Sequence, residues 1–267
     1  MKILLTGDDG YNSLGTRLLI HFLKDEHELM VAGTSTQQSG VGGGMTLSHG
    51  FNWEETMVDG IKALKTEGSP VDAIELTRCY FAKEFKFDLV IAGINWGWNL
   101  GNFIISSGTL ASATRVIGVG LADRAVVYNW DLPPEFYLMK HSPEENLDQY
   151  LSYPGSAAKK IFNLAQQNNF WQAQILNVNF PRKPSAKVKF AYPAAKITDV
   201  YEYQYQKMGK AKKGRFVYEG GAIANKHGDQ NIDNVAIANG WITITPLRAD
   251  FLDQKTAELM RGKEFTI

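Results

Sequence analysis

The sequence predicts an α/β fold built on a mostly parallel sheet, and two observations support this prediction. Short apolar runs alternate with segments of helical period, so that Lys2–Thr6, Gly15–Leu23 and Leu29–Gly33 form an expected strand, helix and strand. Such a unit builds a parallel sheet. The apolar runs also end in polar or glycine-rich segments, as is typical of sheets that bind ligands at the carboxyl ends of their strands.

The later elements follow from the same patterns. Ser69 is expected to be the N-cap and Pro70 the first residue of a helix that runs to about Phe81. The elements expected after it are a strand over Asp88–Ala92, a helix over Ser106–Ile117, a strand over Ala125–Tyr128, an amphipathic helix over Pro154–Asn168, a strand over Ile175–Phe180, a strand over Trp241–Thr245 and a helix over Asp250–Arg261. Residues 201–228 are aromatic, basic and without helical period, and are expected to form a protruding hairpin or arm.

The composition excludes several classes of function. The 28 basic residues balance the 28 acidic ones, which argues against nucleic-acid or membrane-surface binding as the main role. Cys79 is the single cysteine, so no intrachain disulfide can form, and its helical surroundings predict that it fills the core. The first apolar run is too short for a signal peptide, and no run is long enough to span a membrane, so a cytoplasmic location is expected.

Asp8 and Asp9 follow the first strand directly. Two neighbouring carboxylates repel each other unless a cation or hydrogen-bond donors compensate, and their hard oxygens suit Mg²⁺ or Mn²⁺. The simpler interpretation of the dipeptide is a turn, or a cap for the following helix. On the dipeptide alone, the turn is the favoured interpretation.

Two further polar segments follow predicted strands. The glycine-rich stretch Gln37–Met45 contains Ser39, and its backbone could hold an anion, although a flexible surface loop is the better explanation of this stretch taken alone. The segment Gly93–Gly101 contains Asn95 and Asn99, whose amide oxygens are neutral ligands for a metal.

The next predicted helix opens with hydroxyl side chains. Ser106, Ser107 and Thr109 lie around Gly108, where free N–H groups make a natural phosphate site, and a plain N-cap is the alternative. Since parallel strands place their carboxyl ends at one edge of a sheet, these polar segments should converge there. The convergence favours a functional site over separate turns.

Other kinds of site lack their signatures. No His-x-x-x-His or Cys-x-x-Cys spacing indicates zinc, and no Gly-x-Ser-x-Gly elbow indicates a serine hydrolase. The basic run Lys207–Arg215 could contact nucleic acid, but a solvated arm or a segment exchanged with a partner subunit is the better explanation.

The order of these motifs resembles the SurE family of metal-dependent 5′/3′-nucleotidases. The matching segments are ILLTGDDGYNSLG (3–15), QQSGVGGGMTL (37–47), GSPVDAIEL (68–76), IAGINWGWNLGNFIISSGTLASA (91–113), LNVNFP (176–181) and IDNVAIANGWITITPL (232–247). They span nearly the whole chain in the family's order. The resemblance implies a Rossmann-like three-layer sandwich in one domain, with its core at about 1–130, 170–190 and 235–247.

The resemblance also implies the assembly, the cofactor and the site. An arm at about 195–230 and a C-terminal helix at about 250–262 would be exchanged between subunits of a homodimer or homotetramer. One Mg²⁺ or Mn²⁺ per subunit would be bound by Asp8, Asp9, Ser39 and Asn95, with Asp8 and Asp9 also catalytic. The expected contacts to the phosphate of a nucleoside monophosphate are Gly40, Asn99, Ser107, Gly108 and Thr109.

The chain departs from the family pattern at several positions. Gly7 stands where the family usually has Asn, Leu14 where it has Pro, Arg115-Val116 where it has Glu-Gly, and Ile232 where it has Thr. These departures motivate an alternative function, a paralogue that binds nucleotide or phosphate as a sensor or scaffold. A dinucleotide-dependent oxidoreductase is disfavoured, because two carboxylates would repel the pyrophosphate.

Overall fold

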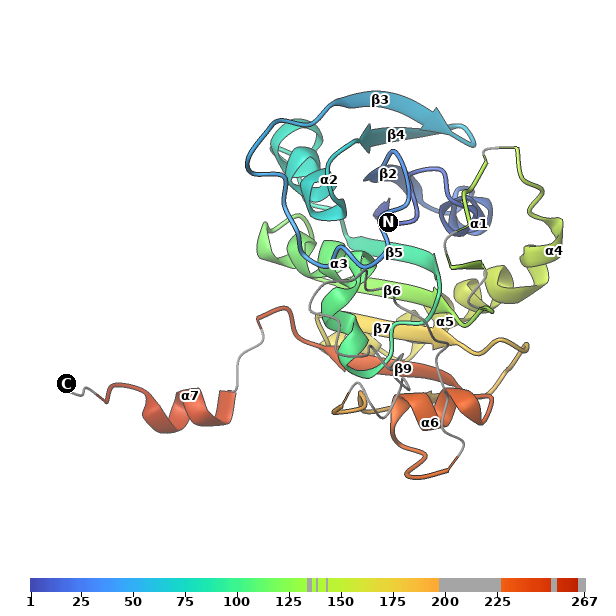
Figure 1. Cartoon of the computed structure of the whole chain (residues 1–267), viewed down its shortest axis with the longest axis vertical. Helices are drawn as coiled ribbons and strands as arrows, with labels where there is room; N and C mark the ends of the chain where they lie inside the picture. The colour runs from blue at the N-terminus through green and yellow to red at the C-terminus, as the bar shows by residue number, and fades with distance from the viewer. Residues whose placement is uncertain (134–135, 138, 143, 197–226, 251–253, 264–267) are drawn as a thin grey trace, which may run out of the picture.

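The computed structural model describes residues 1–133, 136–137, 139–142, 144–196, 227–250 and 254–263 (Figure 1). The strands are β1 (Lys2–Thr6), β2 (Glu28–Thr34), β3 (Trp53–Val58), β4 (Ile61–Thr66), β5 (Leu89–Trp96), β6 (Ala125–Trp130), β7 (Ile175–Phe180), β8 (Val188–Phe190) and β9 (Ile242–Leu247). The α-helices are α1 (Leu14–Leu23), α2 (Pro70–Leu76), α3 (Gly108–Gly118), α4 (Asp148–Tyr150), α5 (Ser156–Gln167), α6 (Asp233–Ala238) and α7 (Gln254–Met260). π-helical turns cover Thr77–Phe81 and Leu151–Gly155, and 3₁₀ helices cover Gly101–Ser106 and Phe170–Gln172.

A single nine-stranded sheet forms the centre of the molecule, in the order β3-β4-β2-β1-β5-β6-β7-β9-β8. Its pairings are parallel except for β3 with β4 and β7 with β9. The predicted α/β fold with a mostly parallel sheet is therefore confirmed. β1 lies between β2 and β5, so the chain leaves it toward one side of the sheet and later returns on the other.

Helices cover both faces of the sheet and make a three-layer sandwich, as Figure 1 shows. α1 and α5 pack together over one face, on a core cluster that includes Leu18, Ile91 and Phe162. α2 and α3 pack together over the opposite face, on a second cluster that includes Leu4 and Val127. Residues alternate between these clusters along β1, because successive side chains of a strand point to opposite faces.

The helix starts follow local sequence signals. At α2, the Ser69 hydroxyl accepts from the Asp72 N–H and the Asp72 carboxylate accepts from the Ser69 N–H, at 3.1 and 2.8 Å. With Pro70 as the first helical residue, this capping box confirms the predicted start. The cap of α1 is Ser13, whose hydroxyl accepts from Thr16 N–H. Asp8 and Asp9 therefore do not cap α1.

The structure corrects the prediction for Cys79. The helix that begins at Pro70 stays α-helical only to Leu76, and Cys79 lies in the π-helical turn that follows, with its side chain exposed. A π turn adds a residue to the helical repeat and so rotates the apolar face expected from a regular helix. The single cysteine is therefore not part of the core.

Several elements were not predicted from the sequence, namely the β3–β4 hairpin, β8 and α6. β3 is mostly exposed and has no alternating apolar pattern. It exists as a strand because it pairs with β4, where Glu54 faces Lys65 and forms an ion pair with it.

The predicted arm cannot be compared over most of its length, because residues 197–226 lie outside the described part of the chain. α7 falls within the predicted C-terminal helix. Among the described residues, no helix has the length and apolar character that crossing a membrane requires.

Candidate active site

The candidate site lies at the carboxyl end of β1, where Asp8 and Asp9 are only 4% and 7% exposed. β2 and β5 flank β1 on either side. The order in which the chain adds strands to the sheet therefore reverses at β1. In open α/β sheets, the crevice for ligands forms at such a switch point. The position of the two carboxylates is therefore that of a ligand site.

Asp9 is fixed by one donor to each of its oxygens. The backbone N–H of Trp96, at the end of β5, donates to Asp9 Oδ2 at 2.8 Å. The Gln37 side-chain amide donates to Asp9 Oδ1 at 2.9 Å. Burial and the nearby negative charge of Asp8 raise the pKa of Asp9 to about 7.

Asp8 rests on the amino-terminal end of α3. The Thr109 hydroxyl donates to Asp8 Oδ1, and the backbone N–H groups of Gly108 and Thr109 also stabilise the carboxylate. A Cβ at position 108 would come within 2.7 Å of Asp8 Oδ2, so only glycine permits this approach. Burial nevertheless raises the pKa of Asp8.

Asn95 joins the group through the same hydroxyl. Its Oδ1 lies 3.1 Å from Thr109 Oγ1, and its Nδ2 donates to the Gly97 carbonyl at 3.0 Å, which leaves the amide oxygen directed at the site. The structure thus brings together oxygens of Asp8, Asn95 and Thr109. Thr109, which was predicted as a phosphate contact, lies between two of the predicted metal ligands.

The glycine-rich loop passes beside this group. Gln38 N–H donates to the Asp8 carbonyl at 2.7 Å, and Gly42 N–H donates to the Ser106 carbonyl at 3.0 Å. Between these two attachments, Ser39 and Gly40 are exposed. The loop therefore spans from β1 to the segment that precedes α3, with Ser39 on its accessible part.

Two predicted phosphate contacts have other partners. The Ser107 hydroxyl accepts from Leu110 N–H at 3.1 Å and so caps α3. The Asn99 amide donates to Asn129 Oδ1 at 2.7 Å, while Asn177 and Asn179 donate to the Asn99 carbonyl. This buried amide network fixes the backbone after β5 and does not direct the Asn99 amide nitrogen at the carboxylates.

The donor set fits a hard divalent cation. Within the described residues, no Lys, Arg or His forms an ion pair with Asp8 or Asp9, so no cationic side chain among them compensates the charge of this buried acidic pair. The same residues contain no group of three His, Cys, Asp or Glu side chains placed to hold a metal. A site here would therefore combine two carboxylates with neutral hydroxyl and amide oxygens, which suits Mg²⁺ or Mn²⁺ better than Zn²⁺.

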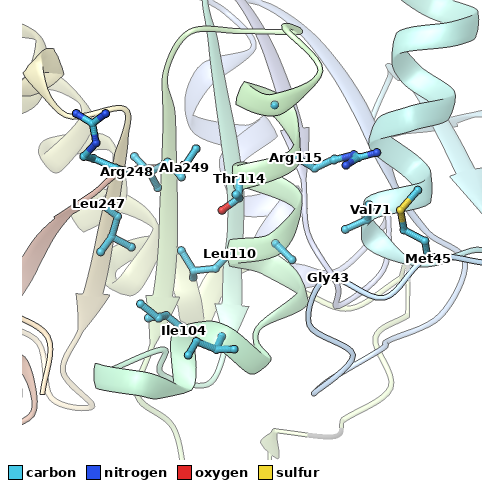
Figure 2. Close-up of a pocket in the computed structure, with 14 residues that line it drawn as sticks. Gly43, Met45, Val71, Ile104, Leu110, Thr114, Arg115, Leu247, Arg248 and Ala249 are labelled. Atoms are coloured by element: carbon cyan, nitrogen blue, oxygen red, sulfur yellow. The ribbon is translucent and has the colours of Figure 1, made fainter. Parts of the chain in front are cut away.

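A separate hollow of about 470 Å³ runs along α3 (Figure 2). Its walls are mainly apolar and include Ile104, Leu110 and Leu247. None of Asp8, Asp9, Ser39 and Asn95 lines it. The hollow is thus adjacent to the segment around Ser107 but distinct from the carboxylate site.

The departures from the family pattern have local explanations in part. Leu14 is buried in the core as the first residue of α1. Arg115 forms an ion pair with Glu75 of α2. Ile232 leaves α6 without a side-chain cap. Gly7 lies beside Gly93, and nothing in the structure explains the loss of an amide side chain there.

Gln37 and Trp96 are site residues that the sequence did not single out. Gln37 lies in the glycine-rich stretch but carries no pattern of its own that predicts a contact to Asp9, and Trp96 contributes a backbone group that has no residue signature. The one available signal was position, since both lie at or just beyond the carboxyl end of a strand.

Comparisons with known proteins agree with this architecture. The family model described as "Survival protein SurE" matches residues 3–207. A protein of Nitratidesulfovibrio vulgaris named 5′-nucleotidase SurE is 30% identical, with 97% of this chain and 91% of that protein covered. Another of the same name from Cytophaga hutchinsonii is 26% identical, over 98% of this chain and 97% of that protein.

A solved structure gives the same result for the fold. The crystal structure of the SurE protein from Aquifex aeolicus superimposes with a TM-score of 0.76 at 22% identity, over 98% of both chains. At that identity the likeness shows the fold alone. The family model, which matches residues 3–207, and the relative that is 30% identical over 97% of this chain establish that this chain belongs to the SurE family.

Proposed function

We propose that this chain is a divalent-metal-dependent phosphatase that releases phosphate from nucleoside 5′- or 3′-monophosphates. The hydrolase class is supported by membership of a family whose named relatives are 5′-nucleotidases. The observation that carries the metal dependence is the buried pair Asp8 and Asp9, which has oxygen ligands around it and no cationic side chain paired with it among the described residues.

In this proposal Asp8, Asp9, Ser39 and Asn95 hold one Mg²⁺ or Mn²⁺ per subunit. The bound ion supplies Lewis-acid polarisation of a phosphoryl oxygen and lowers the pKa of a coordinated water. Trp96 N–H and the Gln37 amide orient the Asp9 carboxylate, and the Thr109 hydroxyl donates to Asp8 with Asn95 Oδ1 3.1 Å away. One of the two aspartates accepts the proton of the attacking water.

The amino-terminal end of α3 is proposed to stabilise the phosphate. The N–H groups of Gly108 and Thr109 already stabilise one anion, the Asp8 carboxylate. The positive end of the helix dipole also favours charge that develops on non-bridging phosphate oxygens placed beside it. Ser107, which also caps the helix, and Gly40 complete the proposed phosphate surroundings, whereas Asn99 supports them only from the buried amide network, because its amide nitrogen donates to Asn129.

The Asp8→Asn variant tests this function. It keeps the shape of the side chain and removes its charge, so phosphate release from a panel of nucleoside monophosphates with Mn²⁺ should fall by about a hundredfold or more. Circular dichroism should be unchanged. Chelation of the wild-type protein with EDTA should abolish activity, and added Mn²⁺ should restore it. Full activity in Asp8→Asn would refute the assignment.

The same panel separates the alternative function. Tight nucleotide binding by calorimetry, without phosphate release in the wild-type protein, would favour a sensor or scaffold. Arg115, one of its motivations, forms an ion pair on the α2–α3 face, and its charge is therefore accounted for there. We also propose a homodimer or homotetramer, which light scattering would identify.

A further inference from the structure

The support of Asp9 extends beyond its two direct donors. Gln37 and Trp96 each donate to one Asp9 oxygen, and each also contacts a residue in the connection that follows β6. The described residues of that connection that matter here are Tyr137, His141 and Glu145. Both hydrogen bonds to Asp9 are therefore backed by the same stretch of chain.

The side-chain amide of Gln37 can take only one of its two flipped orientations. Its Nε2 donates to Asp9 Oδ1 at 2.9 Å and to the Tyr137 carbonyl at 2.5 Å. A carboxylate and a carbonyl are both acceptors, so the amide must present its nitrogen, and a flipped amide would place Oε1 against two acceptors. Both side-chain N–H groups of Gln37 are therefore used in hydrogen bonds, one to Asp9 and one to the Tyr137 carbonyl.

The Trp96 contact supports the other oxygen. The His141 ring packs edge-on against the Trp96 indole with 5.0 Å between ring centroids, and the His141 side chain is 1% exposed. Its Nδ1 lies 3.6 Å from the Glu145 carboxylate, beyond hydrogen-bond distance, and its contact with Trp96 is one of ring packing. The backbone of Trp96 that donates to Asp9 is therefore held in place from the side of His141.

The same stretch is anchored independently of the site. Arg17 on α1 donates from Nη1 to the Glu145 carbonyl at 2.8 Å and forms an ion pair with Asp59 at 3.1 Å. The Arg17 side chain is only 11% exposed. This anchor ties the connection to α1 and to the turn after β3, outside the candidate site.

From these contacts we infer that Gln37 is a positioning residue, which couples the connection after β6 to the orientation of Asp9 and so sets the affinity of the site for its divalent cation. The inference rests on the proposed metal dependence. Gln37 itself does not touch substrate in this scheme, because both of its N–H groups are used within the protein. His141 acts one step further away, through Trp96.

The experiment measures Mn²⁺ affinity by calorimetry in the full chain. Gln37→Met keeps the length of the side chain and removes both donors, so the dissociation constant should rise about tenfold to a hundredfold, as expected for the loss of a hydrogen bond to a charged group. Gln37→Ala provides a second variant with no donor. The matched control is Gln167→Met on the exposed face of α5, which should bind as the wild type does.

A second pair of variants tests the route through Trp96. His141→Ala removes the ring and should raise the dissociation constant about two- to tenfold, whereas His141→Phe keeps an aromatic ring against Trp96 and should restore wild-type affinity. If His141 served folding alone, His141→Ala would lower the melting temperature of the metal-free protein, but the two variants would not differ in their Mn²⁺ affinity.

The outcomes separate the inference from the proposed function. If both Gln37 variants bind Mn²⁺ within about twofold of the wild type, the inference is wrong even when the enzyme is active. If the wild type binds Mn²⁺ and the variants bind it weakly, but no nucleotide is hydrolysed, the inference holds and the proposed function is wrong. A wild-type protein that binds no Mn²⁺ overturns both.

Discussion

At the scale of single residues, the candidate site depends on how closely Asp8 approaches α3. Gly108 is the first residue of this helix, and the Asp8 carboxylate occupies the space that a Cβ would need. At the other end of the same helix, a Cβ at Gly118 would meet no atom within 4 Å. The two glycines therefore have different reasons to be there, and alanine substitution distinguishes them.

Gly108→Ala should displace Asp8 and lower Mn²⁺-dependent phosphate release by about tenfold or more, since a misplaced ligand weakens both the metal site and the geometry of reaction. Gly118→Ala should leave activity unchanged and raise the free energy of unfolding by about 0.5–1 kcal/mol, because alanine is the better helix former. Phosphate release and urea denaturation measure the two effects. Equal activity in both variants would mean that the close approach is not required.

At the scale of elements, α2 and α3 are joined by an ion pair. Arg115 on α3 contacts Glu75 on α2, with side chains 38% and 28% exposed. The partial exposure limits the strength of the pair, because solvent screens it. The positive charge at position 115 is therefore matched by an acidic partner on the neighbouring helix.

Arg115→Glu reverses the charge at this position and places a carboxylate against Glu75. We expect the free energy of unfolding to fall by about 0.5–1 kcal/mol, as for two like charges brought together on a partly exposed helix surface. The double variant Glu75→Arg with Arg115→Glu restores an opposite pair and should recover most of the loss. Urea denaturation of the wild type, the single variants Arg115→Glu and Glu75→Arg, and the double variant completes the cycle, and no recovery in the double variant would contradict the pairing.

At the scale of the whole molecule, the two buried carboxylates make stability depend on pH and on metal. Burial raises the pKa of both Asp8 and Asp9, the latter to about 7, above the value of 3.8 for an unperturbed aspartate. The folded state therefore holds protons that the unfolded state has already released between about pH 4 and pH 7. Stability from these groups is full below that window and is lost as the pH rises through it.

The melting temperature of the metal-free protein should show this loss, and Mn²⁺ should reverse it. In EDTA, Asp9→Asn should become more stable relative to the wild type as the pH rises from about 5 to about 8. Mn²⁺ at about a hundred times its dissociation constant should raise the wild-type melting temperature by about 5 °C or more at pH 8, and by less at pH 5, where protons compete for the carboxylates. A melting temperature that Mn²⁺ does not change at pH 8 would contradict a metal site at Asp8 and Asp9.

The sequence by itself determined most of the fold. Hydrophobic periods predicted β1, α1, β2, β5, β6, α5 and β7, and the Ser69-Pro70 signal predicted the start of α2. These signals are local, because a period or a cap is written in consecutive residues. The β3–β4 hairpin and the exposure of Cys79 were not predicted from the sequence. The hairpin depends on the pairing of two strands, and the exposure of Cys79 depends on a change of helical repeat.

The sequence also predicted part of the candidate site, and the tertiary structure decided the rest. The order of polar segments after strands predicted that a site forms at this edge of the sheet, and the resemblance to the SurE family named Asp8, Asp9, Ser39 and Asn95 as its ligands; that set remains a prediction. Only the tertiary structure decided three contacts. Trp96, 87 residues away, orients Asp9. Thr109 lies between Asp8 and Asn95, and Gln37 joins Asp9 to Tyr137. Such contacts arise where distant segments meet at the edge of the sheet, so no local pattern in the chain encodes them.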